Sequence, residues 1–124
     1  MTTADATCVG MSATFLDPQL FTTLIEQAPG LALVDFTADH CPPCRMMAPH
    51  VDKLAQTLAG SVVVAKVDCD AHPEIAARFG VRGTPTLIFF RGGQVVDRIV
   101  GAVPPERLLA ACQRLREIPA AVDM

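Results

Sequence analysis

Two cysteines separated by two prolines form the segment of the chain best suited to chemistry. It reads Asp39-His40-Cys41-Pro42-Pro43-Cys44-Arg45. Two thiols at this spacing can exchange with a disulfide or supply half of a zinc site. A zinc site needs two further ligands, and the chain has no second Cys-x-x-Cys or His-x-x-His pair. We therefore expect no metal, and we favour redox chemistry over a chance pair of core cysteines.

Cys41 stands where a helix is expected to begin. The proline after it biases its backbone away from the helical conformation, which suits an N-cap residue. Pro42 and Pro43 fit the first turn, where backbone N–H groups have no helical partner. The positive end of the helix dipole favours a thiolate, the reactive form of cysteine. We expect Cys41 to be the reactive, partly exposed thiol and Cys44 to be more buried and to resolve a mixed disulfide.

One carboxylate interrupts an apolar run. Asp35 lies within Leu31–Thr37, a segment bounded by chain breakers and expected to form a strand buried on both faces. A buried charge costs several kcal/mol unless it is paired, so burial should raise the pKa of Asp35. The residues alone leave two interpretations open: a proton-transfer group, or a structural carboxylate paired with Lys66.

Breakers and apolar periodicity divide the rest of the chain into alternating strands and helices. Strands are expected at Phe15 and over residues 31–37, 61–67, 86–90 and 94–100, and helices over 18–28, 42–59, 73–80 and 105–116. Leu20 and Met46 are expected on the apolar faces of the first two helices. Gly92-Gly93 predicts a hairpin between the last two strands. This order predicts an α/β fold, with a mixed sheet between helices and parallel pairing among the early strands.

Composition limits the class of protein. The chain has 124 residues, of which 51% are apolar and 19% charged, and its net charge is −3. One domain over residues 12–117 is expected, with a lead-in at 1–11 and a tail at 118–124. The lack of basic clusters, Trp and Tyr argues against nucleic-acid binding. No apolar run approaches the roughly 20 residues of a membrane span.

The number of cysteines, which is five, gives information about the cellular compartment of the protein. Residues 1–11 show no secretory signal pattern, and an odd number of cysteines argues against a secreted disulfide framework. We therefore expect a cytoplasmic protein. Cys112 is expected in the core and Cys8 in an exposed segment. Cys69 is expected to be a partly buried small apolar residue, with a regulatory or dimer-forming thiol as the alternative.

Several segments, in order, resemble the thioredoxin family. They cover about Phe15 to Glu117 and include Val34-Asp35-Phe36, Cys41-Pro42-Pro43-Cys44-Arg45-Met46-Met47-Ala48-Pro49, Ala65-Lys66-Val67-Asp68, Phe79-Gly80-Val81-Arg82-Gly83-Thr84-Pro85-Thr86 and Val100-Gly101. The resemblance implies the thioredoxin fold, a three-layer α/β/α sandwich with a mixed, centrally parallel sheet and a C-terminal antiparallel hairpin. It also implies a protein-disulfide reductase with no cofactor beyond a Cys41–Cys44 disulfide, and a flavoprotein thioredoxin reductase as electron donor. We expect a monomer that acts on disulfide-containing proteins.

The resemblance also implies a role for each site residue. Cys41 would attack the substrate disulfide and Cys44 would resolve the intermediate. Asp35 would exchange the Cys44 proton, with Lys66 as its charge partner. Pro85 would be a cis-proline facing the disulfide, although X–Pro bonds in general are mostly trans. The substrate groove would be formed by His40, Pro42, Pro43, Gly83, Thr84, Pro85, Gly101 and Ala102. Pro49 has a structural role and is expected to kink its helix.

The active-site segment departs from the usual Trp-Cys-Gly-Pro-Cys of the family. His40 and Pro42 replace the Trp and the Gly, and Thr37 stands where an aromatic residue is common. Pro42 removes an N–H near the Cys41 sulfur, whereas a protonated His40 would stabilise its thiolate. These opposed effects leave the redox potential open. A reductant is expected; the alternatives are a more oxidising oxidase or isomerase, and a non-catalytic binding module.

Overall fold

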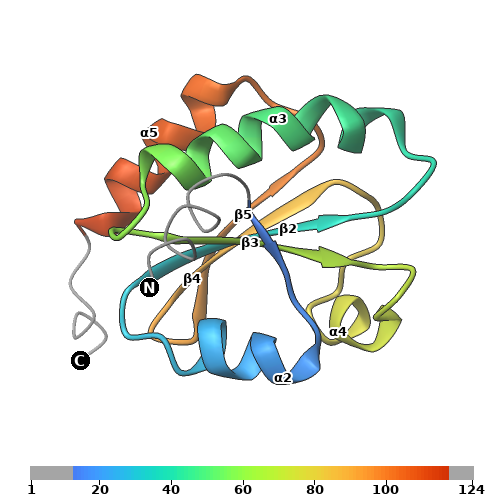
Figure 1. The fold of residues 1–124 in the computed structure, drawn as a ribbon, viewed down its shortest axis with the longest axis horizontal. Helices are drawn as coiled ribbons and strands as arrows, with labels where there is room; N and C mark the ends of the chain where they lie inside the picture. The colour runs from blue at the N-terminus through green and yellow to red at the C-terminus, as the bar shows by residue number, and fades with distance from the viewer. Residues whose placement is uncertain (1–12, 118–124) are drawn as a thin grey trace, which may run out of the picture.

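The computed structural model describes residues 13–117, which form a five-stranded sheet between two helical layers (Figure 1). The strands are β1 (Thr14–Phe15), β2 (Leu31–Thr37), β3 (Val63–Asp68), β4 (Thr86–Arg91) and β5 (Gln94–Val100). The helices α3 (Pro42–Thr57) and α5 (Pro105–Arg116) cover one face of the sheet. The other face is covered by α2 (Pro18–Phe21), the helical turn η1 (Thr22–Glu26) and α4 (Pro73–Arg78). The three-layer α/β/α architecture expected from the sequence is confirmed.

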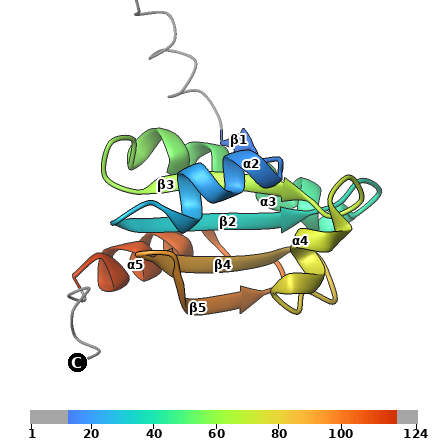
Figure 2. The same ribbon diagram turned by 90° about the horizontal axis from the view of Figure 1, so that it is seen from below.

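The sheet is mixed, and its strand order is β1-β3-β2-β4-β5, which Figure 2 shows from the side of α2 and α4. β1 and β2 both run parallel to β3. β4 runs antiparallel to β2, and β5 returns antiparallel to β4 through the Gly92-Gly93 turn. The expected early parallel pairing and final hairpin are therefore both present. The order places β2, which carries Asp35, at the centre of the sheet.

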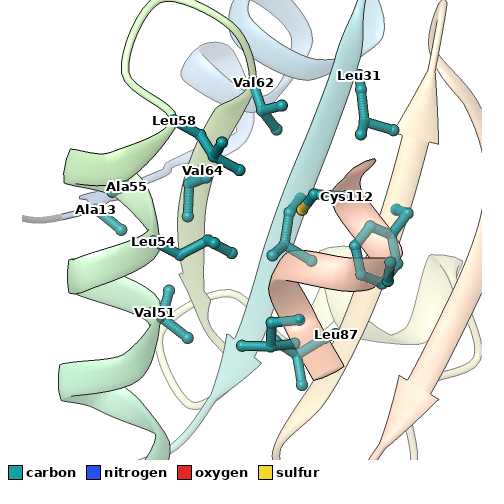
Figure 3. Close-up of a cluster of buried hydrophobic side chains, with 14 of the residues drawn as sticks. Ala13, Leu31, Val51, Leu54, Ala55, Leu58, Val62, Val64, Leu87 and Cys112 are labelled. Atoms are coloured by element: carbon teal, nitrogen blue, oxygen red, sulfur yellow. The ribbon is translucent and has the colours of Figure 1, made fainter. Parts of the chain in front are cut away.

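Each face of the sheet carries its own apolar cluster. Under α3 and α5, residues such as Val51, Leu54, Leu87 and Cys112 pack together (Figure 3). On the opposite face the cluster is aromatic, and the rings of Phe79 and Phe90 meet edge to face with centroids 5.2 Å apart. Burial on both faces explains why β2 is apolar along almost its whole length.

The first helix differs from its prediction. Instead of one α-helix over 18–28, a short α2 continues into the wider turn η1, which closes with a 3.0 Å bond from the Gln27 N–H to the Thr22 carbonyl. The hydroxyls of Thr22 and Thr23 donate to backbone carbonyls four residues earlier, a contact that competes with the regular helical pattern. Leu20, expected on the apolar face, is exposed.

The second helix, α3, agrees more closely with the range predicted from the sequence. α3 runs through Pro49 and ends at Thr57, two residues before the predicted end. Met47 is completely buried against the sheet, so Met46, the next position around the helix, points away from it and is 64% exposed. The expectation that Met46 lies in the core is therefore wrong. β3 starts at Val63 rather than Ser61, and α4 ends at Arg78.

Candidate active site

The junction between β2 and α3 positions both cysteines. Cys41 is the N-cap of α3, with extended backbone angles (φ −124°, ψ 99°), and Pro42 and Pro43 form the first turn. The N-cap position predicted for Cys41 is thus present. Cys41 and Cys44 are joined by a disulfide, with Cα atoms 5.2 Å apart. Cys41 is partly exposed, whereas Cys44 is buried beneath it.

Two donors point at the Cys41 sulfur. The backbone N–H of Cys44 and the hydroxyl of Thr84 each donate to Cys41 Sγ over 3.3 Å. Hydrogen bonds to the charged form of a group favour that form, so both contacts stabilise a Cys41 thiolate in the reduced protein. The hydroxyl of Thr84 therefore supplies a donor where Pro42 cannot. Sequence reasoning placed Thr84 in the groove and missed this contact, because the contact depends on a loop 43 residues away.

The loop before β4 lies against the disulfide. The Thr84–Pro85 peptide bond is cis, as the family resemblance implied, and Pro85 is buried. The Thr86 hydroxyl donates to the Gly83 carbonyl over 2.7 Å, and the Gly101 N–H donates to the Pro85 carbonyl over 2.8 Å. These bonds join the end of β5 to the cis-proline loop. The structure thus brings Gly83, Thr84, Pro85 and Gly101 together beside Cys41.

The solvent-facing side chains of these segments are mostly apolar. The exposed residues of the α3 start and the β5 end are Pro42, Pro43, Arg45, Met46, Val100 and Ala102, and of these only Arg45 is charged. Met46 and Val100 are 64% and 69% exposed, and sequence reasoning assigned neither to the site. His40 is exposed and has a positive φ of 57°, a conformation that His adopts more readily than most residues.

Asp35 lies behind the disulfide in the centre of the sheet. It is 1% exposed, and its Oδ1 atom has no hydrogen-bond partner. Burial raises the pKa of Asp35 to about 6; the positive charge of Lys66 opposes this rise and the negative charge of Asp52 adds to it. The raised pKa that the sequence predicted is therefore present, with desolvation as its main cause.

Lys66 lies on β3 directly opposite Asp35 in the strand register. Its ion pair, however, is with Asp52 of α3, at 3.1 Å between Nζ and Oδ1. Sequence reasoning named Lys66 as the charge partner of Asp35 and missed Asp52. The sequence does contain a signal for Asp52. It is a charged residue four positions after Ala48, one helical turn further along, at the border of the apolar stripe of α3.

A cavity of about 170 Å³ lies between Asp35, Lys66 and the buried Cys44. Its lining consists of Phe15, Asp35, Thr37, Ala38, Asp39, Cys44, Arg45, Ala48, Lys66 and Asp68. Asp35 and Cys44 therefore share one space, which is large enough for water and partly open to solvent. Such a space allows a proton to pass between a buried carboxyl and a buried thiol.

The other cysteines differ from Cys41 in their surroundings. Cys69 is half-buried, and burial together with the charges of Asp68 and Asp70 raises the pKa of its thiol to about 11. Cys112 is fully buried in α5, as predicted, and burial raises the pKa of its thiol to about 11 as well. Both are weak nucleophiles at neutral pH, which favours the apolar-residue interpretation of Cys69. Cys8 lies outside the described residues.

Residues 13–117 contain neither a metal-ligand cluster nor a membrane-spanning helix. No group of three or more His, Cys, Asp or Glu side chains in this range is placed to hold a metal ion. No helix of the same range is long and apolar enough to cross a membrane.

The arrangement of the two sulfurs determines the chemistry available to them. An incoming thiol can reach only the partly exposed sulfur of Cys41, and the buried Cys44 sulfur is then the leaving group. In the reverse direction the Cys41 sulfur is the one exposed enough to attack a disulfide, and Cys44 is placed to close the ring again. A pair that opens and closes in this way is characteristic of a dithiol–disulfide oxidoreductase.

Comparisons with known proteins agree. The family model described as Thioredoxin matches residues 12–114. Thioredoxin 1 of Nostoc sp. is 53% identical over 76 residues, which cover 61% of this chain and 71% of that protein. A thioredoxin of Synechocystis sp. is 48% identical over 82 residues, covering 66% and 77%. A solved mutant thioredoxin from Halobacterium salinarum NRC-1 has a TM-score of 0.78 and 31% identity, over 89% of this chain and 96% of that one.

The chain belongs to the thioredoxin family. Its activity is that of a thioredoxin-type protein-disulfide reductase, with the Cys41–Cys44 disulfide as its redox-active group.

Proposed function

We propose that Cys41 attacks substrate disulfides and that Cys44 then releases the reduced substrate. In the first step the Cys41 thiolate bonds to one substrate sulfur, and the other leaves as a thiolate that takes up a proton. In the second step Cys44 gives up its proton and attacks Cys41 Sγ, which breaks the bond to the substrate. Two electrons pass from the dithiol to the substrate. The observation that carries this assignment is the partly exposed Cys41 sulfur, held by two donors above a buried Cys44.

Asp35 accepts the Cys44 proton in the second step. Its pKa of about 6 is close to neutral, where a carboxylate can take up a proton and return it. It lines the same cavity as Cys44, so water in that cavity can carry the proton between them. The Lys66 charge tunes this carboxyl. Pro49 has a structural role only, because it lies within α3 and faces solvent.

Substrate proteins bind to the surface around the disulfide. The exposed apolar side chains of Pro42, Pro43, Met46, Val100 and Ala102 offer contact area. The Thr84–Pro85 backbone and the Gly83 and Gly101 segments border that surface, and an extended substrate can pair with their backbone groups. His40 lies at its edge.

A flavoprotein thioredoxin reductase returns two electrons to the oxidised protein. The protein works as a monomer in the cytoplasm. It needs no cofactor of its own. The odd number of cysteines in the chain argues against a secreted disulfide framework, which supports a reducing location.

The test traps the first intermediate. Cys44→Ser is incubated with a small peptide that contains one exposed disulfide, and the product is weighed by mass spectrometry. We expect a covalent adduct at Cys41 that dithiothreitol releases. The matched control, Cys41→Ser, should form none at the active site, because its remaining active-site thiol is buried. Equal adduct in both variants, or none in either, would favour the binding-module alternative.

The reduction potential tests the direction of the reaction. The Cys41–Cys44 pair is equilibrated in thiol/disulfide buffers and analysed by alkylation and mass, since the chain has no Trp to report by fluorescence. A potential near about −270 mV supports a reductant. A potential above about −200 mV would instead indicate an oxidase or isomerase.

A further inference from the structure

Asp52 lies on α3, about two turns further along the helix than Cys44. Its Oδ1 atom makes two polar contacts: it accepts the backbone N–H of Ala13 over 3.0 Å, and it lies 3.1 Å from Lys66 Nζ. Its side chain is 29% exposed. Because one oxygen is held by a fixed backbone group and by an ammonium, the carboxylate has a defined position.

The Lys66 ammonium is held on two sides. Asp52 pairs with it, and the ring of Phe15 lies 5.4 Å from Nζ. The Lys66 side chain is only 9% exposed, so these contacts act with little screening by water. Lys66 is nevertheless the register partner of Asp35 on the neighbouring strand, and such partners project from the same face of the sheet. The Asp35 Oδ1 atom has no hydrogen-bond partner.

We propose that Asp52 is a positioning residue of the dithiol site, which holds the Lys66 ammonium away from Asp35 and so leaves Asp35 able to accept the Cys44 proton. The proposal rests on the role proposed above for Asp35. It assigns a task to a carboxylate that touches neither sulfur.

The physical reason is electrostatic. An ammonium in direct contact with a carboxylate lowers the carboxyl pKa by roughly 1 to 3. Asp52 prevents that contact, and its own negative charge also raises the pKa of Asp35. Both effects act in one direction, so Asp35 remains a stronger base than it would be beside a free Lys66. Base strength matters here because the group must remove a proton from a thiol.

Other titratable groups share the surroundings of Asp35. Those that line the same cavity are Asp39, Cys44, Arg45 and Asp68. Each of them is unchanged in the variants below, so their influence cancels when the variants are compared. The oxidised protein is used because its active-site thiols do not titrate.

The test measures the carboxyl titration of Asp35 by ¹³C NMR in Asp52→Asn. Asparagine can still accept the Ala13 N–H but has no charge. We expect the pKa of Asp35 to fall by about 1 or more. Asp52→Glu should keep the original value within a few tenths, as should Glu117→Gln, a neutralised exposed carboxylate at the end of α5. An unchanged or raised Asp35 pKa in Asp52→Asn overturns the proposal. Asp52→Ser offers the same test if the asparagine variant does not fold.

A second variant separates the holding of Lys66 from the charge of Asp52 itself. Adding Lys66→Met to Asp52→Asn should reverse most of the fall in the Asp35 pKa, because no ammonium remains to approach Asp35. If removing the Asp52 charge lowers the Asp35 pKa equally in the presence and in the absence of Lys66→Met, Asp52 acts only through its own charge, and the holding role is wrong.

Rates complete the experiment. In Asp52→Asn the pH profile of mixed-disulfide resolution should move to lower pH by the same amount as the Asp35 titration, and the plateau rate should fall. A rate profile that stays in place while the Asp35 pKa falls overturns the link between Asp52 and catalysis. The role of Asp35 is checked separately: an Asp35→Asn protein as fast as the wild type would remove the proposed function of Asp35, whereas the NMR titration would still report on Asp52.

Discussion

Replacing Asp35 with asparagine should make the stability of the oxidised protein less dependent on pH. The carboxyl has an ordinary pKa of 3.8 and a folded-state pKa of about 6, because burial disfavours its charged form. Between these values the folded protein binds more protons than the unfolded chain, so the free energy of unfolding falls as pH rises. The free-energy cost of burying the charged carboxylate is absent at pH values below 3.8, the pKa in the unfolded chain, and complete at pH values above about 6, the pKa in the folded protein. It amounts to roughly 3 kcal/mol.

The size of the effect follows from burial. Asp35 is 1% exposed, so screening by solvent reduces this penalty little. In Asp35→Asn the new amide has poorly partnered polar atoms, at a cost of about 1–3 kcal/mol. That cost does not vary with pH. The difference in unfolding free energy between Asp35→Asn and the wild type should therefore move in favour of the variant by roughly 2–3 kcal/mol from pH 4 to pH 8.

The assay is urea unfolding of both oxidised proteins at several pH values, followed by far-UV circular dichroism because the chain lacks Trp and Tyr. Glu117→Gln is the control, since it neutralises a carboxylate that is exposed rather than buried. A constant difference for Asp35→Asn across this range would refute the conclusion that Asp35 is a buried acid with a raised pKa.

Two further predictions concern the site loop and the hairpin. Thr84→Val removes the hydroxyl that donates to Cys41 Sγ over 3.3 Å, and it should raise the Cys41 thiol pKa by up to about 1, measured as the pH dependence of alkylation; an unchanged pKa would mean that the hydroxyl contributes nothing to the thiolate. Gly93→Ala should destabilise the protein by more than Gly92→Ala in thermal unfolding. Both glycines have positive φ, but an added Cβ at Gly93 meets a backbone oxygen of η1 at 2.5 Å, whereas Gly92 faces open space. Equal losses would contradict this account.

The sequence alone determined the elements and the placement of the cysteines. The prolines after Cys41 have a fixed φ and no N–H, so this pair fits the first turn of a helix, and Cys41 is the N-cap. The apolar run around Asp35 and the Gly92-Gly93 turn are equally local signals. For this reason β2 and β5 begin and end at their predicted residues.

Local signals were weaker where neighbouring residues compete. The α2 and η1 segment has apolar residues at helical spacing, but threonine hydroxyls bond its carbonyls and the helix widens. Met46 and Met47 are the same residue type. Which of them is buried depends on which side of α3 packs against the sheet. Spacing along a helix defines a stripe but does not say how far around the helix the packing extends.

Only the tertiary structure decided which groups surround the sulfurs and Asp35. Thr84 reaches Cys41 because the loop before β4 passes the start of α3, and Lys66 pairs with Asp52 rather than Asp35 because α3 crosses the sheet above β3. These contacts join residues that lie many positions apart in the sequence, and each forms only because folding brings two atoms to 3.1–3.3 Å from one another. Local conformational preference extends over a few residues, so it could specify the thiol pair. The partners that tune the pair depend on how the helices pack on the sheet.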